Sequence, residues 1–351
     1  MDASTPSLRA RRRVPVGRWP ALVALLIIVA GCASPGASRV SLPPDATASA
    51  VPVATGTPSP APTAAGFPLT LTDDEGTSVT IAAEPERIVS LTPAATETLF
   101  ELGAGGRVVG KVEDLANHPP EAADIPVVGT FAGVDVEQIV GLETDLVIAG
   151  GGGGTPDETI DRLRGLGIPV LVVYAATVNQ VFADIELIGA AAGEADRARD
   201  LAATMRAGFD EVAAATADLD RPRVFYETGD TPAIYGVADE SFVAGMLELA
   251  GADPITTGSS SVWEMSQERL ISADPEMILL GDAAYGVTAE TVGARPGWAG
   301  MTAVREGAIE PIDDIVVTRP GPRLLEGLHA LVAVIHPAGV LPGASAAPTG
   351  G

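Results

Sequence analysis

Short runs of β-branched and aliphatic residues alternate with helical patterns along the chain from Arg87 onward. Each run is bounded by Gly, Pro or polar residues and is too short for a helix, so the runs predict buried strands. Strands are expected at 87–91, from 108, and at 145–149, 170–173, 224–226, 277–280 and 309–312, and helices at 94–102, 136–142, 155–166, 242–249 and 324–334. Thr155 is a candidate N-cap for the third of these helices. Strands and helices in this order predict βαβ units with mainly parallel sheets.

One longer helical pattern, at 194–217, interrupts the alternation. Its apolar residues Leu201, Met205, Phe209 and Val212 are three or four positions apart and form one face of a helix about 35 Å long. Strand and helix patterns resume after it. The fold class is therefore expected to be α/β, with two Rossmann-like lobes joined by one long helix and a ligand cleft between the lobes.

An internal repeat supports two related lobes. Residues 136–148 align without gaps onto residues 267–279, and both segments contain a glutamate, an apolar pair, an acidic turn and a hydrophobic run. Glu137 and Glu268 occupy equivalent places in the two copies. The repeat predicts that the cleft is lined by the carboxyl ends of equivalent strands.

The N-terminus has the pattern of an export signal. Five arginines lie between residues 9 and 18, followed by an apolar stretch, 20–30, that is too short to span a bilayer. The stretch ends in Val-Ala-Gly-Cys, which resembles the bacterial lipobox, and Cys32 is the only cysteine of the chain. We expect Cys32 to carry a lipid anchor. The alternative is a buried free cysteine that follows an ordinary signal peptide.

Composition sets the remaining domain boundaries. Residues 32–66 are mostly Ala, Pro, Ser and Thr and predict a disordered tether, as does the tail at 338–351. The expected order is a signal peptide at 1–31, the tether, an N-terminal lobe at 67–193, the linking helix at 194–217 and a C-terminal lobe at 218–337. The protein is then expected on the outer face of the cytoplasmic membrane, at the cell surface or in the periplasm.

Charge and residue counts exclude several kinds of site. The chain has 351 residues, a formal net charge of −25, one cysteine and three histidines. These counts exclude a disulfide framework and a multi-cysteine zinc site, and they leave little room for a histidine-rich metal site. The negative charge argues against binding to a nucleic acid backbone. We expect no resident cofactor.

Several motifs, in a constant order, resemble one family. The segments 85–97 (PERIVSLTPAATE), 117–122 (NHPPEA), 129–133 (GTFAG), 262–268 (VWEMSQE) and 319–323 (RPGPR) are similar to those of the class III substrate-binding proteins. These proteins deliver vitamin B12, ferric siderophores or haem to ABC importers. The resemblance implies a monomeric binding protein rather than an enzyme, with a permease dimer as its partner and a metal chelate as its ligand.

The resemblance also implies the residues that contact the ligand. Thr92 and Pro93 follow the first strand, Phe131 and Trp263 match positions that are aromatic in the family, and Arg319 is expected to meet ligand oxygens. Tyr235, together with Tyr226, is expected near the cleft at the start of the second lobe.

His118 stands where family members often place a tyrosine, which coordinates iron in the haem-binding relatives. A histidine could serve as an axial ligand of the bound chelate, or it could make an ordinary hydrogen bond within its loop. The run Gly150–Gly154 stands where the vitamin B12-binding relative has a tryptophan, and we interpret it as a flexible rim of the cleft.

Glu137 and Glu268 match the acidic residues with which the family docks onto arginines of the two-fold symmetric permease. The alternative is that both are solvated glutamates at helix starts, favoured there by the helix dipole.

Three functions remain open on the sequence. The first is a binding protein for a metal chelate, with a ferric siderophore or cobalamin preferred to haem as the ligand. A secreted hydrolase or metalloenzyme would need a Gly-x-Ser-x-Gly or His-Glu-x-x-His motif, and the sequence contains neither. A ligand-sensing accessory domain would have the same cleft but a signalling partner.

Overall fold

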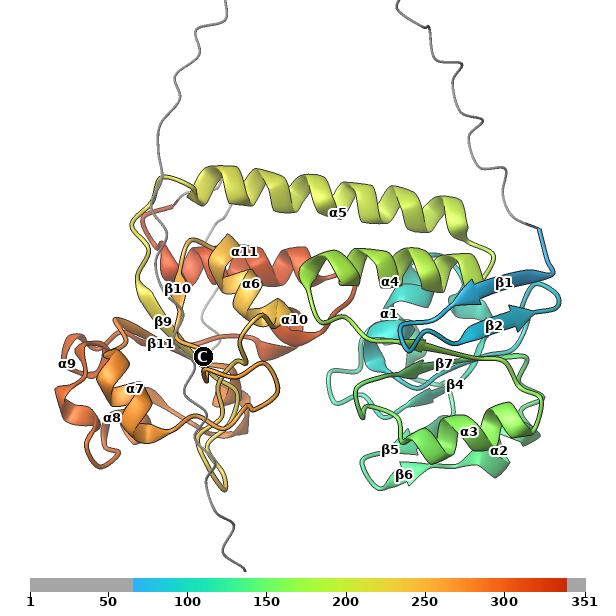
Figure 1. The fold of residues 1–351 in the computed structure, drawn as a ribbon, viewed down its shortest axis with the longest axis horizontal. Coiled ribbons are helices and arrows are strands. Elements are labelled where there is room, and N and C mark those ends of the chain that lie inside the picture. Colours follow the sequence, from blue (N-terminus) through green and yellow to red (C-terminus); the bar gives the residue numbers. More distant parts are fainter. Residues whose placement is uncertain (1–65, 340–351) are drawn as a thin grey trace, which may run out of the picture. The chain divides into compact units, whose positions relative to one another are not determined.

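Residues 66–339 are described by the structure, a computed structural model (Figure 1). Within this range the strands are β1 Leu69–Thr72, β2 Ser78–Ile81, β3 Ile88–Ser90, β4 Val108–Val112, β5 Val127–Thr130, β6 Gly133–Val134, β7 Leu146–Gly150, β8 Val170–Val173, β9 Arg223–Glu227, β10 Asp253–Pro254, β11 Met277–Leu280 and β12 Ile309–Pro311. The α-helices are α1 Pro93–Glu101, α2 Val136–Gly141, α3 Asp157–Gly165, α4 Val178–Ala191, α5 Ala195–Thr216, α6 Phe242–Leu249, α7 Gln267–Ala273, α8 Ala289–Gly293, α9 Thr302–Glu306, α10 Asp314–Thr318 and α11 Leu324–Ile335. None of the helices in this range is long and apolar enough to cross a membrane.

The N-terminal lobe is built on a six-stranded sheet in the order β6-β5-β4-β3-β7-β8. All neighbouring strands are parallel except β5 and β6. Successive residues of each central strand point to opposite faces, so Ile88 packs on one side and Val89 on the other. Helices α1 and α4 cover the first face, and α2 and α3 cover the second. Because both faces are covered, β7 and β8 are apolar throughout, which made them recognisable in the sequence.

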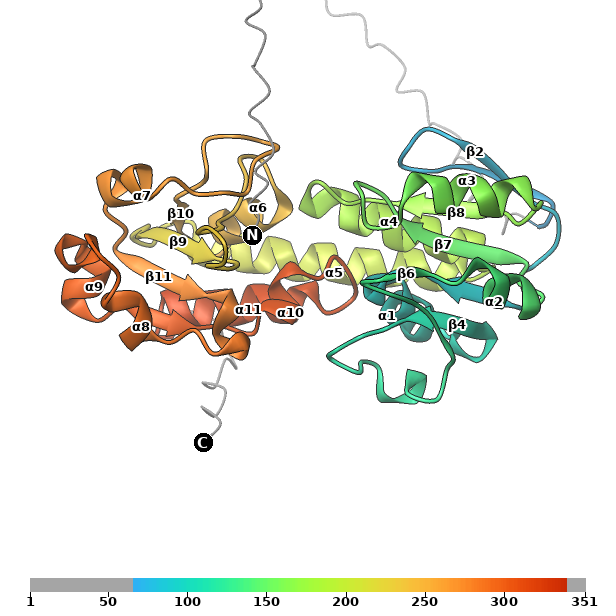
Figure 2. The same ribbon diagram turned by 90° about the horizontal axis from the view of Figure 1, so that it is seen from below.

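The C-terminal lobe has a parallel four-stranded sheet in the order β10-β9-β11-β12. Figure 2 shows the sheets of the two lobes at either end, with α5 crossing behind both. The predicted α/β class with two lobes and mainly parallel sheets is thus confirmed.

Matching hydrogen bonds at the start of the two sheets support the internal repeat. The backbone N–H of Arg87 donates to Asp145 at 3.0 Å, and that of Arg223 donates to Glu276 at 2.9 Å. Each arginine Nε also donates to a carbonyl at the C-terminal end of the repeat helix of its lobe, that of Leu142 after α2 or of Ala273 in α7. Asp145 and Glu276 are aligned residues of the repeat, so the sequence match reflects equivalent structure in the two lobes.

Helix α5 joins the lobes and lies within the predicted range 194–217. Its buried apolar residues belong to one apolar cluster that includes Leu102 after α1 and residues of α4 in the first lobe, and residues of α6 and α11 in the second. Phe209 of α5 meets Phe182 of α4 edge to face, with ring centroids 5.3 Å apart. The lobes therefore share a core along α5 in addition to the chain connection.

Several elements differ from the sequence prediction, which omitted the hairpin β1–β2, the strands β5, β6 and β10, and the short helices α8, α9 and α10. Thr155 is not the N-cap of α3, because Pro156 holds that position and the Thr155 hydroxyl accepts a hydrogen bond from the Gly150 N–H instead. Helix α4 was not predicted at all, although it packs along α5 and is capped by Thr177 and Gln180. Residues 1–65 and 340–351 lie outside the described range, and so do the predicted signal peptide, Cys32, almost all of the tether and most of the tail.

Candidate ligand-binding site

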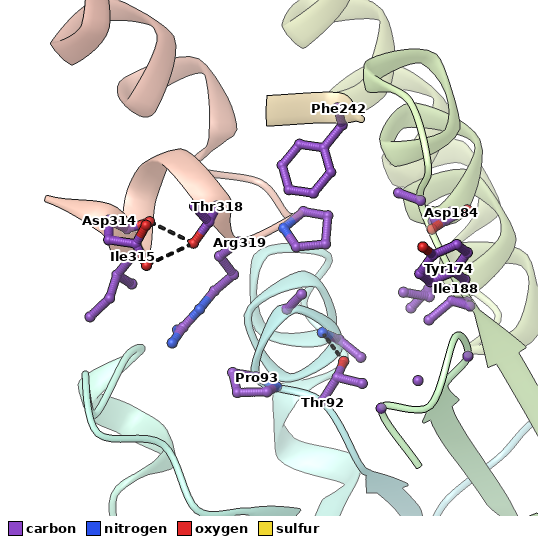
Figure 3. A pocket seen from close by; sticks show the side chains of 18 residues that line it. Thr92, Pro93, Tyr174, Asp184, Ile188, Phe242, Asp314, Ile315, Thr318 and Arg319 are labelled. Carbon is purple, nitrogen blue, oxygen red and sulfur yellow. Dashed lines mark hydrogen bonds between the residues drawn. The ribbon is translucent and has the colours of Figure 1, made fainter. Parts of the chain in front are cut away.

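A pocket of about 430 Å³ lies between the two lobes (Figure 3). The first lobe contributes the N-terminal end of α1, the carboxyl ends of β7 and β8, and one face of α4, and the second lobe contributes α10 and the start of α6. Figure 3 shows Tyr174, Asp184 and Ile188 on one side of the pocket and Thr318 and Arg319 on the other. The pocket therefore occupies the place that the topology of two parallel sheets predicts for a ligand.

Thr92 and Pro93 line this pocket at the start of α1. Thr92 is the N-cap, and its hydroxyl accepts a hydrogen bond of 3.0 Å from the Ala95 N–H. Pro93 at the first helical position has no N–H to offer. At the end of α1 that faces the pocket, the Ala95 N–H is already bonded to Thr92, and Pro93 has no N–H. Few backbone N–H groups are left for an anionic ligand, so this helix end is a poor anion site.

The glycine run brings backbone rather than side chains to the pocket wall. A Cβ on Gly150 would lie 2.7 Å from Cγ2 of Thr92, and a Cβ on Gly152 would lie 2.5 Å from the ring of Tyr174. Tyr174 directly follows β8, lines the pocket and is half exposed. Gly152 is therefore required because the Tyr174 ring occupies the space beside it, and Gly150 because the Thr92 methyl group does.

A second pocket of about 320 Å³ adjoins the first and shares Phe242, Asp314 and Thr318 with it. Tyr235 and Trp263, both predicted to contact the ligand, line this second pocket. Tyr235 is held in place by backbone bridges to the Gly229 and Glu264 loops. Aromatic rings thus line both pockets, and such rings stack on flat ligands.

Arg319 lies at the end of α10 and lines the first pocket, but its guanidinium is bound to carboxylates of the other lobe. It donates to Glu97 of α1 and, at 2.8 and 3.1 Å, to both carboxylate oxygens of Asp114. Arg323 donates to the same Glu97 at 2.8 and 3.1 Å. The side chain of Glu97 is only 3% exposed. We call these four residues the interlobe ion cluster.

The charged forms of the residues in the interlobe ion cluster stabilise one another. Burial raises the pKa of Asp114, but hydrogen bonds from Arg319 and from the backbone of Ala116 and His118 outweigh it, so this pKa is lowered overall. The hydrogen bond to Glu97 raises the pKa of Arg323 further. Among the described residues that line the two pockets, Arg319 is the one basic side chain, and two acids of its own chain already pair with it.

Two further carboxyl groups line the first pocket from opposite lobes. Asp314 accepts a hydrogen bond of 2.8 Å from the hydroxyl of Tyr226, and burial raises the pKa of Asp314. Tyr226 is fully buried, so it reaches the pocket only through Asp314. Asp184, on α4, has its pKa raised to about 8 by burial and by the neighbouring carboxylate of Asp74.

The predicted ligand residues His118 and Phe131 are not among the side chains that line either pocket. His118 is half-buried in the loop after β4, where its backbone N–H donates to Asp114 at 3.3 Å. Phe131 is 97% exposed in the turn between β5 and β6. Within residues 66–339, no group of three His, Cys, Asp or Glu side chains is placed to hold a metal ion. Ligand contact by His118 and Phe131 stays a prediction.

Comparison with known proteins identifies the family of this chain. Residues 88–315 match the family described as periplasmic binding protein. The chain belongs to this family. It is 32% identical to an uncharacterized ABC transporter substrate-binding lipoprotein, YvrC, of Bacillus subtilis, over 92% of this chain and 97% of the relative. It is also 32% identical to a cobalamin-binding protein of Halobacterium salinarum, over 78% of this chain and 75% of the relative.

The fold is also similar to that of a solved structure. The periplasmic haem-binding protein RhuT of Roseiflexus, in its apo form, superposes with a TM-score of 0.63 at 28% identity, over 72% of this chain and 98% of RhuT. The three relatives named here are binding proteins and not enzymes, which agrees with the family to which this chain belongs.

Glu137 and Glu268 occupy equivalent positions in this periplasmic binding protein. Each is exposed and is the second residue of its helix, α2 or α7. Both helices lie on the faces of their sheets that point away from α5 (Figure 1). Glu137 also forms an ion pair with Arg162 of α3. A docking role for the two glutamates stays a prediction.

The pocket residues that the sequence analysis missed include Tyr174, Asp184, Phe242 and Asp314. Tyr174 follows a predicted strand, so the reasoning applied to Thr92 would have found it. Phe242 begins a predicted helix and reads as an ordinary core residue. Asp184 lies on the helix that was not predicted, and nothing in the local sequence marks Asp314 as a partner of Tyr226.

Proposed function

We propose that this chain captures a cobalamin-type chelate outside the cytoplasmic membrane and delivers it to the permease of an ABC importer. The observation that carries the proposal is the interlobe pair of pockets, which combines aromatic walls with carboxyl groups and has its one arginine already paired.

The arrangement of aromatic residues suits a large flat ligand. Tyr174 stands on the first lobe, Phe242 where the two pockets join, and Trp263 in the second pocket. A macrocycle placed across the shared residues can contact rings from both lobes, and each ring face contributes favourable stacking. At the glycine run, the ring of Tyr174 lies beside Gly152 and gives this wall of the pocket an aromatic face.

The charge of the pocket discriminates between the candidate chelates. Haem carries two propionates and catecholate siderophores are strongly anionic, so both need free cationic partners in a buried site. Here Arg319 is bound to Glu97 and Asp114, and Asp184 and Asp314 add acidic groups. A corrin bears uncharged amides around its rim, which such a pocket can accept. The cobalamin-binding relative from Halobacterium supports the same choice.

Anchoring and delivery complete the proposal. The lipobox-like sequence before Cys32 would attach the mature chain to the membrane, as the word lipoprotein in the name of the Bacillus relative also suggests. Glu137 and Glu268, exposed at matched positions of the two lobes, would meet basic residues of a two-fold symmetric permease. Localisation at the outer face of the membrane follows from the anchor.

A ligand panel tests the proposal. Purified protein is mixed with cyanocobalamin, haemin, ferrichrome or a ferric catecholate, and its melting temperature and the ligand absorbance are recorded. Cyanocobalamin should raise the melting temperature most, because a ligand that binds only the folded state stabilises it. If haemin or the catecholate gave the largest shift, the charge argument would be contradicted. If ferrichrome gave the largest shift, the ligand would be a siderophore and the proposed cobalamin-type ligand would be wrong.

Matched aromatic variants locate the ligand. Trp263→Ala removes a ring from the second pocket and should weaken cyanocobalamin binding by roughly 5- to 100-fold. Tyr285→Ala also removes an aromatic ring, at an exposed position outside both pockets, and should leave the affinity unchanged. Weaker binding by Tyr285→Ala together with unchanged binding by Trp263→Ala would contradict the placement of the ligand in the second pocket.

A further inference from the structure

The bond between Arg319 and Asp114 connects the wall of the first pocket to the loop that follows β4. Arg319 lines this pocket from the second lobe, and its Nη1 and Nη2 groups donate to the two Asp114 oxygens at 3.1 and 2.8 Å. Asp114 is not among the side chains that line either pocket. An arginine without acidic partners at this wall would attract ligand carboxylates, because its N–H groups form a planar fork that matches them.

Asp114 is held in place by its own loop. Its side chain is only 6% exposed, and the backbone N–H groups of Ala116 and His118 donate to it at 3.0 and 3.3 Å. Burial alone would raise the pKa of Asp114, but the hydrogen bonds from Arg319 and from these two N–H groups lower it overall. The loop therefore presents a fixed negative charge to Arg319 near neutral pH.

Asp114 supplies the charge that makes the interlobe ion cluster neutral. Two guanidinium groups face two carboxylates in this cluster, and Glu97 is shared by Arg319 and Arg323. Asp114 is thus the carboxylate that Arg319 does not share with Arg323. Without its charge, both guanidinium groups would depend on Glu97, and the wall of the pocket would carry one net positive charge. Water screens charges only weakly in such a largely buried place, so that charge would act on a ligand in the pocket.

We propose that Asp114 is a specificity-determining residue that excludes anionic chelates, because it neutralises Arg319 at the wall of the first pocket. The inference rests on the proposed function, since it assumes that the chelate lies in this pocket. Asp114 acts through Arg319 and does not contact the ligand. A carboxylate on the rim of a chelate gains the full charge of Arg319 only by displacing Asp114, which the loop holds in place. The favoured ligands are therefore chelates whose rim groups are uncharged.

Removing the charge of Asp114 should convert the pocket into one that accepts anions. Haemin, with its two propionates, is the anionic probe, and its affinity is measured by absorbance titration of the purified protein. Asp114→Asn should bind haemin roughly 10- to 100-fold more tightly than wild type, the range expected when a ligand gains one hydrogen bond to a charged group. This gain should shrink as the salt concentration rises, which a merely structural effect would not do. Asp114→Ser is a second variant that keeps an oxygen for the loop N–H groups, and melting curves show which variants are folded.

Two controls assign the gain to Arg319. Glu113→Gln removes the same charge one residue earlier, at an exposed side chain outside both pockets, and should bind haemin as wild type does. Adding Arg319→Leu to Asp114→Asn should remove the gain. Haemin affinity equal to that of wild type in a folded Asp114 variant, or a gain that persists without Arg319, would overturn the inference.

A parallel titration of wild type with cyanocobalamin separates the inference from the proposed function. If wild type binds cyanocobalamin and the Asp114 variants gain no haemin affinity, the inference is wrong and the proposed function stands. If wild type does not bind cyanocobalamin but the variants gain haemin affinity through Arg319, the proposed ligand is wrong and the role of Asp114 stands. A wild type that binds haemin more tightly than cyanocobalamin overturns both.

Discussion

Replacing Glu97 with glutamine tests the interlobe ion cluster. Glu97, on α1 of the first lobe, is 3% exposed and accepts hydrogen bonds from Arg319 and Arg323 of the second lobe. In Glu97→Gln, Arg319 keeps Asp114 as its partner, but Arg323 loses the carboxylate to which it is bound. The variant therefore leaves one guanidinium without an ion-pair partner at a largely buried position.

The size of the effect follows from that burial. Breaking a fully buried ion pair from one side costs about 3–5 kcal/mol. The Arg323 side chain is 22% exposed, so water can solvate part of its charge, and we expect a loss of about 2–3 kcal/mol in the free energy of unfolding. For a protein of this size that corresponds to a fall in melting temperature of about 4–12 °C.

Equilibrium unfolding in urea measures the change. Glu101→Gln is the matched control, since it makes the same substitution at an exposed position of the same helix and should cost less than about 0.5 kcal/mol. Adding Arg323→Leu to Glu97→Gln should recover part of the loss, because it removes the unpaired charge. If Glu97→Gln is as stable as Glu101→Gln, or if the double variant is less stable still, the reasoning about the cluster is refuted.

Three other predictions concern the pocket, the permease and the anchor. The pKa of Asp184 rises from 3.8 to about 8 on folding, so between these pH values the folded chain holds a proton that the unfolded chain releases. The free energy of unfolding should therefore fall by up to about 1.4 kcal/mol per pH unit as the pH rises from 4 to 8. Asp184→Asn should flatten this slope in unfolding curves, and an unchanged slope would show that another group titrates. Reversing the charge of both Glu137 and Glu268 should abolish uptake in cells while affinity for the ligand stays within a few-fold; lost affinity in the purified variant would contradict a docking role. Cys32→Ala should release the protein from membranes, and full retention after a carbonate wash would exclude a lipid anchor at this residue.

The strands were predictable because their physical signal is local. Strands such as β7 and β8 are buried on both faces, so every residue is apolar and the run stands out from its Gly- and Pro-rich surroundings. Helix α4 gave no comparable signal. It packs against the sheet through Ile188 and against the α5 cluster through Phe182 and Ile185, so it lacks a single apolar stripe with a polar face opposite.

The candidate site was only partly predictable, because its decisive contacts are distant in sequence. Thr92 and Pro93 were found since they follow a recognisable strand, and Trp263 and Arg319 since they lie in family-like motifs. The pairing of Arg319 with Asp114 joins residues 205 positions apart, and a single sequence contains no signal that links them. From the sequence alone, Arg319 is therefore interpreted as a free donor for ligand oxygens. The acidic character of the pocket cannot be inferred without knowledge of that pairing.

The most direct test of the account is a calorimetric titration of cyanocobalamin into wild type and Ala94→Trp. Ala94 is half-buried in the first turn of α1 and lines the first pocket, so a tryptophan there would fill the space assigned to the ligand. Ala132→Trp, at an exposed loop residue, serves as the control. The account predicts one binding site in wild type and in the control, and at least about a hundredfold weaker binding in a folded Ala94→Trp protein. Binding by Ala94→Trp with the affinity of wild type would show that the ligand does not occupy this pocket.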